Sequence, residues 1–254
     1  MKYSDLVSMA VEVGYLLVVN GGEIYRAEES IQRIFCAYGV ETGEVFVIPT
    51  LIEVTVCMPD GKPITKIKRV SGRTINLDRV EQVNALCRYI CSKRPNFTEI
   101  QAALSRIKER PILSFPKQTI AYAVIAAAFT LFFGGSLSDA AVALFCGAAI
   151  RLTTQFLERF RVNSFFVNIA ASFMAAVIAL TAANFNFSLS YDKIIIGSLM
   201  NLVPGIAITN FMRDIIAGDM IAGILRLTES VLVATAIAIG AGMALTASRM
   251  LWGV

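Results

Sequence analysis

The second half of the chain contains five apolar stretches, and they limit the fold more than any other feature of the sequence. They lie at about 118–135, 137–157, 163–184, 193–211 and 227–248. A helix that crosses the hydrocarbon core of a bilayer needs roughly 20 apolar residues. The third and fifth stretches meet this length, and Arg151 lies near one end of the second, where its side chain can reach the interface. The pattern predicts an all-α membrane domain of about five transmembrane helices over 113–254.

The composition is that of a membrane protein whose polar and apolar parts are separate in the sequence. Hydrophobic residues make up 56% of the chain, the mean hydropathy is +0.65 and only 17% of residues are charged, which is unusual for a soluble domain. Residues 1–117 hold 16 Lys/Arg and 13 Asp/Glu, whereas residues 118–254 hold 7 and 6. The chain is therefore a polar half followed by an apolar half.

The polar half has the pattern of a mixed α+β domain. Apolar residues recur at helical spacing over 4–19, 23–38, 77–92 and 99–110. Three segments rich in β-branched residues, VFVIP, IEVTVCM and ITKIKRV, lie between the second and third helices and predict strands. Asn76 is the expected cap of the third helix, and Thr98 with Gln101 has capping-box spacing at the fourth. We expect an α+β domain over 1–112.

Residues that are missing from the sequence disfavour several function classes. Histidine is absent, which removes Ser-His-Asp and Cys-His catalysis and the commonest metal ligand. The five cysteines include no CxxC pair, and Cys87 and Cys91 are read as small buried residues rather than a metal pair. Basic residues are spread among acidic ones, which gives little support to nucleic-acid binding. We expect a protein that is not an enzyme and has no metal, cofactor or nucleic-acid partner.

The loop charges predict an orientation in the membrane. The N-terminal stretch LVSMAVEVGYLLVV contains Glu12 and lacks a small-residue cleavage site, so we expect the polar half to stay in the cytoplasm. Lys and Arg collect on the cytoplasmic side of membrane proteins. The basic residues in loops that would share that side are Arg106, Lys108, Arg110, Lys117, Arg159, Arg161 and Arg213. Five spans then place the C-terminus on the periplasmic side.

The stretch 202–230, LVPGIAITNFMRDIIAGDMIAGILRLTES, carries five charges in an apolar setting. A charged side chain that faces lipid costs roughly 2.5 kcal/mol or more near the bilayer centre. The charges must therefore lie in water, among headgroups or in a cavity lined by protein. One interpretation is a cytoplasmic connector over 211–226 with solvated charges. The other is a segment that inserts partway, because IIAG and MIAGIL are themselves apolar.

The second interpretation predicts a site for a small carboxylate. A break at Pro204-Gly205 would free helix ends that hold an anion. Guanidinium groups suit carboxylates, and Asp214 or Asp219 would carry a coupling proton if burial raised its pKa. The predicted substrate contacts are Pro204, Gly205, Asn210, Arg213, Asp214, Asp219, Arg226 and Glu229. Interhelical hydrogen bonding explains Asn210 equally well.

Three motifs cover nearly the whole chain. They are GGEIYRAEESIQRIFCAYGV (21–40), IPTLIEVTV (48–56) with RVSGRTINLDRVEQVNALCR (69–88), and PGIAITNFMRDIIAGDMIAGILRLTES (204–230). Together they resemble the threonine/serine exporter family (ThrE-like), in the split form that has a YjjP-like larger subunit. Tyr25, Arg26 and Glu28 match the first motif. A functional role and a role at the helix surface are both open for these three residues.

The resemblance implies a subunit of a secondary exporter in the bacterial inner membrane. Its cargo would be threonine and serine or a dicarboxylate such as succinate. Full-length members of the family have about twice as many spans as this chain supplies, so a small second membrane subunit is also implied, and a homo-oligomer is left open. The alternatives are a membrane-anchored enzyme and a solute-sensing regulatory subunit, each with its activity in residues 1–110.

Overall fold

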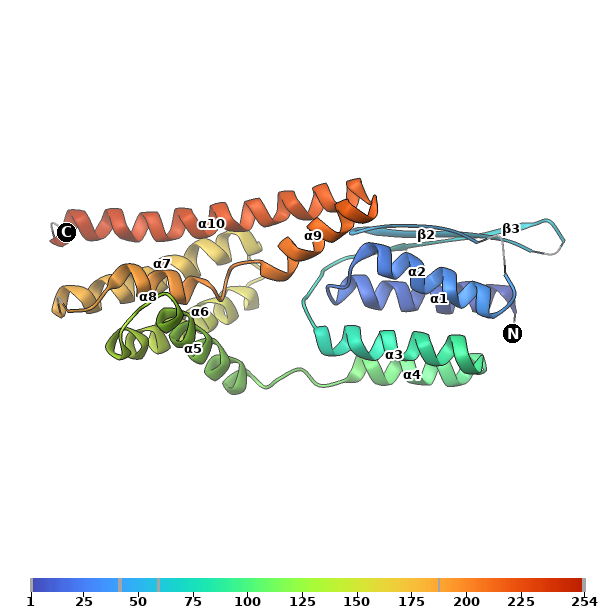
Figure 1. Cartoon of the computed structure of the whole chain (residues 1–254), viewed down its shortest axis with the longest axis horizontal. Helices are drawn as coiled ribbons and strands as arrows, with labels where there is room; N and C mark the ends of the chain where they lie inside the picture. The colour runs from blue at the N-terminus through green and yellow to red at the C-terminus, as the bar shows by residue number, and fades with distance from the viewer. Residues whose placement is uncertain (1, 41–42, 59, 187, 253–254) are drawn as a thin grey trace. The chain divides into compact units, whose positions relative to one another are not determined.

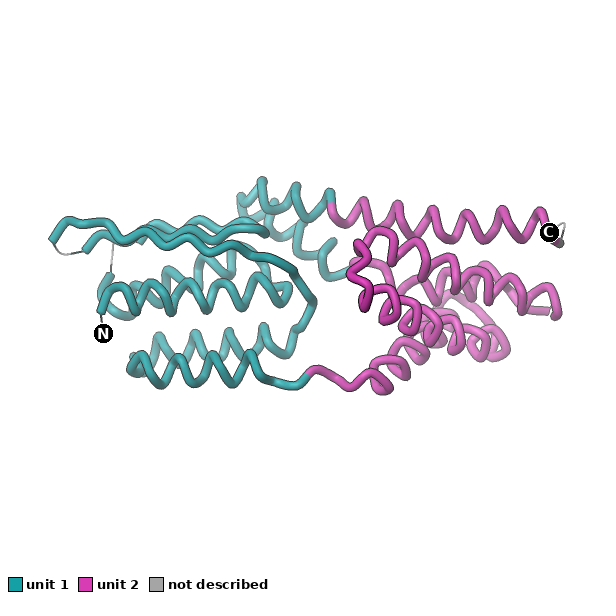
Figure 2. Tube along the Cα trace, turned by 180° about the vertical axis from the view of Figure 1, so that it is seen from behind, with its two compact units in different colours: residues 1–111, 205–228 teal, residues 112–204, 229–254 magenta. Residues whose placement is uncertain are grey.

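The computed structural model describes residues 2–40, 43–58, 60–186 and 188–252. The chain divides into two compact units (Figure 2). Unit 1 comprises Met1–Pro111 and Gly205–Thr228, and unit 2 comprises Ile112–Pro204 and Glu229–Val254. Unit 1 is therefore assembled from two separated parts of the chain, and the second part is most of the charged stretch.

Unit 1 combines helices with one small sheet (Figure 1). Its elements are α1 (Tyr3–Val19), α2 (Ile24–Ala37), β1 (Gly43–Ile48), β2 (Leu51–Cys57), β3 (Pro63–Arg69), α3 (Leu77–Lys93), α4 (Phe97–Glu109), α9 (Gly205–Ala217) and the first part of α10 (Met220–Trp252). The strands pair antiparallel in the order β1-β2-β3, with Val45 opposite Val54 and Val54 opposite Lys66.

Helices α1 and α2 form the middle layer of unit 1, with the sheet on one side and α3 and α4 on the other (Figure 1). Ten of the 17 residues of α1 are buried, as expected for a helix that is apolar on nearly all sides. Ile52, Val54 and Val56 of β2 are fully buried, and their alternation places one face of the sheet against the helices. The apolar N-terminal stretch is therefore the core of this unit.

Asparagine side chains cap α3 and α4 at their first turns. Asn76 Oδ1 accepts a hydrogen bond from the backbone N of Arg79 at 3.1 Å, so the predicted cap is confirmed. Helix α4 begins two residues before the predicted start, because Asn96, and not Thr98, is its cap. Asn96 Oδ1 accepts a hydrogen bond from the backbone N of Glu99 at 2.9 Å, which satisfies one of the free amides of the first turn.

All of the regular secondary structure in the described residues of unit 2 is α-helix. It contains α5 (Phe115–Phe132), α6 (Leu137–Arg159), α7 (Ser164–Phe185), α8 (Tyr191–Leu199) and the remainder of α10. Within the described part of the chain, four helices are long and apolar enough to cross a membrane: α5, α6, α7 and residues Met220–Leu251 of α10. Alanines make up much of the core between them, as is typical of closely packed membrane helices.

The predicted fold class, an α+β N-terminal domain followed by about five transmembrane helices, is wrong. Unit 1 is mainly helical, and its β structure, within the described residues, is one small sheet. It is also not a separate N-terminal domain, because 205–228 belongs to it.

The predicted span 193–211 is divided into α8 and α9, of 9 and 13 residues, and each is too short to cross a bilayer. Pro204 causes the break, because proline has no N–H and disfavours helical backbone at the preceding residue.

Several glycines of unit 2 lie where one helix closely approaches another. A Cβ atom on Gly147 would lie 2.3 Å from the carbonyl oxygen of Tyr122, and one on Gly197 would lie 2.5 Å from the backbone N of Thr130. Small residues allow such close backbone approach in membrane bundles. Gly197 therefore sets the separation of α8 from α5.

Gly197→Ala is expected to destabilise unit 2, because the methyl group would push α8 away from α5. Overpacking of this kind costs about 1–3 kcal/mol, and thermal unfolding of the purified chain in detergent measures it. Gly242→Ala is the matched control, since no atom lies within 4 Å of its Cβ position and alanine favours a helix by up to about 1 kcal/mol over glycine. Equal unfolding temperatures for Gly197→Ala and the wild type would contradict the close contact.

Candidate functional site

The charged stretch folds back on itself where α9 is followed by α10. Gly218 forms the turn with a φ of +101°, a conformation that favours glycine. The turn brings Arg226 of α10 against Asp214 of α9, with 3.0 Å between Nη1 and Oδ2. Asp214 is 0% exposed and Arg226 is 5% exposed. The two charges form a buried ion pair inside unit 1, so a fully solvated connector does not describe them.

This ion pair also contacts the turn between α1 and α2. Asp214 Oδ1 accepts a hydrogen bond from the backbone N of Ile24 at 3.2 Å, and Arg226 Nη2 donates to the carbonyl oxygen of Gly22 at 2.7 Å. Ile24 is the first residue of α2, where backbone N–H groups lack partners within the helix and the helix dipole favours a negative charge. Asp214 thus caps a helix that lies 190 residues away in sequence.

Two further side chains of α9 bind the same turn. Asn210 Nδ2 donates to the carbonyl oxygen of Gly21 at 2.9 Å, and Arg213 Nη1 lies 2.8 Å from Glu23 Oε1. Residues 21–24 are therefore each held by a side chain from 210–226, and we call this set of contacts the α9–α10 clamp. The side chain of Arg213 is 55% exposed, so its guanidinium is the accessible cation of the clamp.

Carboxylates gather beside the clamp. Glu28, one turn after Ile24 on α2, is half-buried, and its Oε1 accepts a hydrogen bond from the backbone N of Val47 at 2.7 Å. Burial raises the pKa of Glu28, and the negative charges of Asp219 and Asp214 add to the increase. Burial also raises the pKa of Asp219. At Asp214 burial raises the pKa although Arg226 opposes it. Burial therefore raises the pKa of both Asp214 and Asp219, as the prediction of a coupling proton on one of them requires. The role in proton coupling itself remains a prediction.

Glu28→Gln is expected to stabilise unit 1 at neutral pH. The folded-state pKa of Glu28 lies above its unfolded value. The protonated carboxyl therefore contributes to the stability of the wild type, and this contribution is lost as the pH rises through the folded-state pKa. Glutamine keeps the acceptor for the Val47 amide and carries no charge at any pH. The unfolding temperature of Glu28→Gln should exceed that of the wild type at pH values above that pKa, and the difference should disappear in acid. An equal pH-dependent gain for Glu29→Gln, whose side chain is 51% exposed, would contradict the role of burial.

The remaining predicted residues lie at different places in the structure. Tyr25 and Arg26 are partly exposed on α2, and Arg26 Nε lies 3.0 Å from Glu23 Oε2. Pro204 is the last residue of its segment in unit 2, and Gly205 begins α9 in unit 1. Glu229 is exposed on α10 within unit 2. The structure therefore brings Asn210, Arg213, Asp214 and Arg226 together, and it adds Glu23, the N-cap residue of α2, and Glu28 on α2.

The length of α10 explains how one helix serves both the clamp and the membrane. It has 33 residues, which is about 50 Å at 1.5 Å per residue and exceeds the hydrocarbon thickness of about 30 Å. Between Glu229 and Arg249 the helix has no charged residue, and this apolar segment is about 28 Å long. Arg226 lies before that segment, so it need not enter the hydrocarbon.

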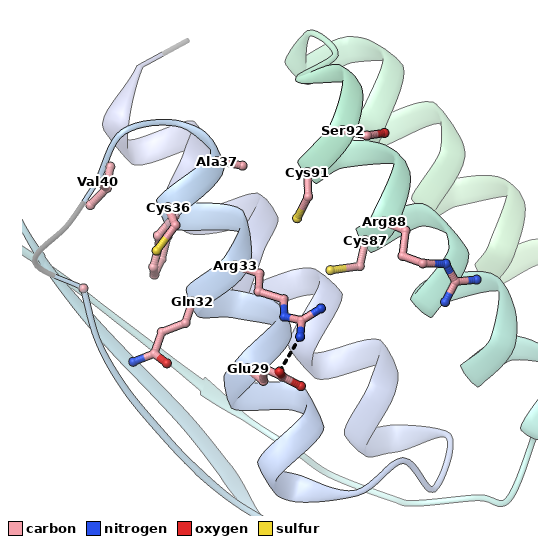
Figure 3. Close-up of a pocket in the computed structure, with 12 residues that line it drawn as sticks. Glu29, Gln32, Arg33, Cys36, Ala37, Val40, Cys87, Arg88, Cys91 and Ser92 are labelled. Atoms are coloured by element: carbon pink, nitrogen blue, oxygen red, sulfur yellow. Dashed lines mark hydrogen bonds and ion pairs between the residues drawn. The ribbon is translucent and has the colours of Figure 1, made fainter.

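Unit 1 also contains a cavity of about 840 Å³ between α2 and α3 (Figure 3). Arg33, Cys87, Arg88 and Cys91 are among its lining residues. Burial raises the pKa of the Cys87 thiol to about 11, and a protonated thiol is a poor metal ligand. Among the described residues, no group of three or more His, Cys, Asp or Glu side chains is arranged to hold a metal ion, and the predicted substrate contacts lie outside this cavity.

Several helices of membrane-spanning length, joined to a polar unit that encloses an ion pair, define a multi-pass membrane protein. The chain belongs to the family described as "Putative threonine/serine exporter", whose model matches residues 8–247. The match confirms the resemblance found in the three motifs. It also confirms that the chain is a transporter-type protein rather than an enzyme.

Individual relatives differ in length. The chain is 22% identical over 259 residues to the threonine/serine exporter of Corynebacterium glutamicum, with 98% of this chain and 53% of the relative covered. It is 24% identical over 249 residues to the probable succinate transporter subunit YjjP of Klebsiella aerogenes, with 97% and 93% covered. The Escherichia coli K12 protein of that name is 23% identical, with 97% and 94% covered. The chain thus spans about half of the first relative. No solved structure matches the chain.

Proposed function

We propose that this chain is one subunit of a secondary exporter of small carboxylates in the bacterial inner membrane. The observation that carries the proposal is the coverage of the relatives. The chain corresponds to 93% of a relative named a transporter subunit but to 53% of a relative named an exporter. A second, small membrane subunit would supply the missing half. The names of the relatives support two cargo classes, threonine and serine or a succinate-type dicarboxylate.

The proposed orientation has the N-terminus in the cytoplasm and the C-terminus in the periplasm. It is supported by the basic residues around the ends of the spans, such as Lys117, Arg159 and Arg161. Four helices are long enough to span the membrane, and an even number of crossings would leave both termini on one side. The proposed orientation therefore requires one more crossing between α7 and α10. We assign this crossing to α8 and the irregular residues before Pro204, as a discontinuous crossing of the kind used by transporters.

Within the α9–α10 clamp, Arg213 is the proposed contact for the carboxylate of the cargo. Its guanidinium is exposed, whereas Arg226 is occupied by Asp214 and by the Gly22 carbonyl. Asn210, Asp214 and Arg226 would hold α9 against the α1–α2 turn and so position Arg213. Asp219, or Glu28 beside it, would carry a coupling proton, because burial raises the pKa of both. Pro204, Gly205 and Glu229 remain proposed contacts of the cargo.

Efflux from loaded cells tests the exporter. Labelled succinate and labelled threonine would be followed in cells that lack the endogenous system and express the chain, a membrane protein matching the second half of the longer relative, both or neither. We expect rapid efflux of one cargo only when both proteins are present. Equal efflux from all four strains would overturn the proposal.

A second function, sensing of a cytoplasmic solute by unit 1, is favoured by the cavity between α2 and α3. Arg33 and Arg88 line it from opposite helices. Removal of 1–110 is a poor test, because it would expose Asp214 and Arg226. Arg88→Ala is the better one: a sensing role predicts that efflux persists but no longer varies with the internal solute concentration. Unchanged concentration dependence would exclude this role for the cavity.

A further inference from the structure

Unit 2 contains a buried cation that the clamp does not involve. Arg151 lies on α6, eight residues before the last residue of that helix, Arg159, or about 12 Å along its axis. Its side chain is only 10% exposed. The guanidinium carbon lies 5.3 Å from the ring centroid of Phe115 and 6.0 Å from that of Tyr122. Arg151 is therefore enclosed by aromatic side chains of α5.

The polar contacts of Arg151 leave its guanidinium incompletely paired. Nη2 donates to Gln155 Oε1 at 2.8 Å. The nearest carboxylate oxygen, Oε2 of Glu158, is 3.9 Å from Nη1, and the Glu158 side chain is 57% exposed. Nε has no hydrogen-bond partner within the described part of the chain, and neither does the buried Oγ1 of Thr154. Residues three apart lie on one face of a helix, so two unsatisfied donors and a positive charge share that face.

A purely structural role does not explain this arrangement. A cation within an apolar helix bundle is expensive and by default marks a functional site. Unpaired buried donors add to the cost, and an apolar side chain of similar length would pack there without either penalty. An anion at this face would accept hydrogen bonds from both Nε and the Thr154 hydroxyl.

We propose that Arg151 and Thr154 form a binding point for a carboxylate group within unit 2. The planar guanidinium presents two parallel N–H donors that match a carboxylate, and aromatic rings can cover its faces while leaving its edge available. The identification of this carboxylate with the exported solute rests on the proposed function.

Arg151→Met tests the site, because methionine keeps an unbranched stem and removes the charge. We expect at least about a tenfold loss of efflux per molecule, the scale of one charge-assisted hydrogen bond, at normal membrane abundance. Arg151→Lys should recover only part of the activity, and Thr154→Val should also reduce it. Arg159→Met is the matched control on the same helix, since Arg159 is exposed, and it should transport normally.

A thermal-shift measurement on the purified full chain separates this inference from the exporter proposal. Succinate, threonine and inorganic phosphate are the probes. We expect succinate or threonine to raise the unfolding temperature of the wild type and of Arg159→Met equally, and that of Arg151→Met by clearly less, because Arg213 remains as a second contact in that variant. A shift in Arg151→Met as large as that of the wild type, or no shift with any probe, would overturn the binding point. If cells show no efflux but the shift in unfolding temperature depends on Arg151, the exporter proposal would be rejected and the binding point at Arg151 would be retained.

Discussion

Asp214→Ala is expected to lower the free energy of unfolding of unit 1 by about 3–5 kcal/mol, the usual cost of leaving one partner of a buried ion pair unpaired. Arg226 is 5% exposed and would keep its charge in a site built for a carboxylate. The first amide of α2 would also lose its cap at Ile24. Chemical denaturation of the purified chain and its abundance in membranes are the measurements.

Two control variants separate charge from packing in this experiment. Asp214→Leu with Arg226→Met removes both charges and is expected to regain most of the lost stability, because packed apolar residues replace buried ion pairs at little cost. Asp60→Ala changes an exposed aspartate whose Oδ2 lies 3.8 Å from Lys62 Nζ. It should lower the free energy of unfolding by less than about 1 kcal/mol. Wild-type stability of Asp214→Ala would show that the pair is not buried as described.

Arg213→Ala is expected to reduce carboxylate efflux by about tenfold to a hundredfold without loss of the protein. A hydrogen bond to a charged group contributes about 1.5–3 kcal/mol, and about 1.4 kcal/mol corresponds to a factor of ten. Stability should change little, because the Arg213 side chain is 55% exposed where it pairs with Glu23 and exposed ion pairs contribute little. The efflux rate per molecule is the quantity to measure.

Arg33→Ala is the matched control for Arg213→Ala. Arg33 is also an exposed arginine of unit 1 that pairs with a glutamate, with 2.6 Å between its Nη2 and Glu29 Oε1, but it lies outside the α9–α10 clamp. Efflux by the Arg33→Ala variant should remain normal when the internal solute concentration is high. Equal losses in both variants would mean that efflux responds to the charge of unit 1 as a whole, and the assignment of Arg213 would then be wrong.

Local patterns in the sequence predicted most of the helices of unit 1. Helical spacing gave α1 and α2 within one or two residues of their observed ends, and Asn76 marked the start of α3. These signals are local, because caps and periodicity depend on residues within one or two turns. The predicted fold class was wrong for two reasons. The three strand-like segments form only one small sheet, and periodicity does not show that 205–228 joins unit 1.

The candidate site was predicted only in part. Arg213, Asp214 and Arg226 were recognised as charges in an apolar stretch, and the structure brings them together. Their partners Gly21, Gly22, Glu23 and Ile24 were not predicted, because a contact across 190 residues leaves no spacing in the sequence. The hint was that Glu23 directly follows a glycine pair in the motif at 21–40, and that the motif at 204–230 also carries charged residues. Arg151 was read as reaching the interface, since sequence does not show which rings enclose a side chain.

Release of labelled succinate or threonine from proteoliposomes tests the central proposal most directly. Vesicles would contain the purified chain, the second membrane subunit, both proteins or none, with the Arg213→Ala chain in a matched set. We predict rapid release of one cargo from vesicles that hold both proteins with the wild-type chain, and slow release from all others. Equal release from the wild-type, Arg213→Ala and protein-free vesicles would contradict a carboxylate exporter whose path passes the α9–α10 clamp.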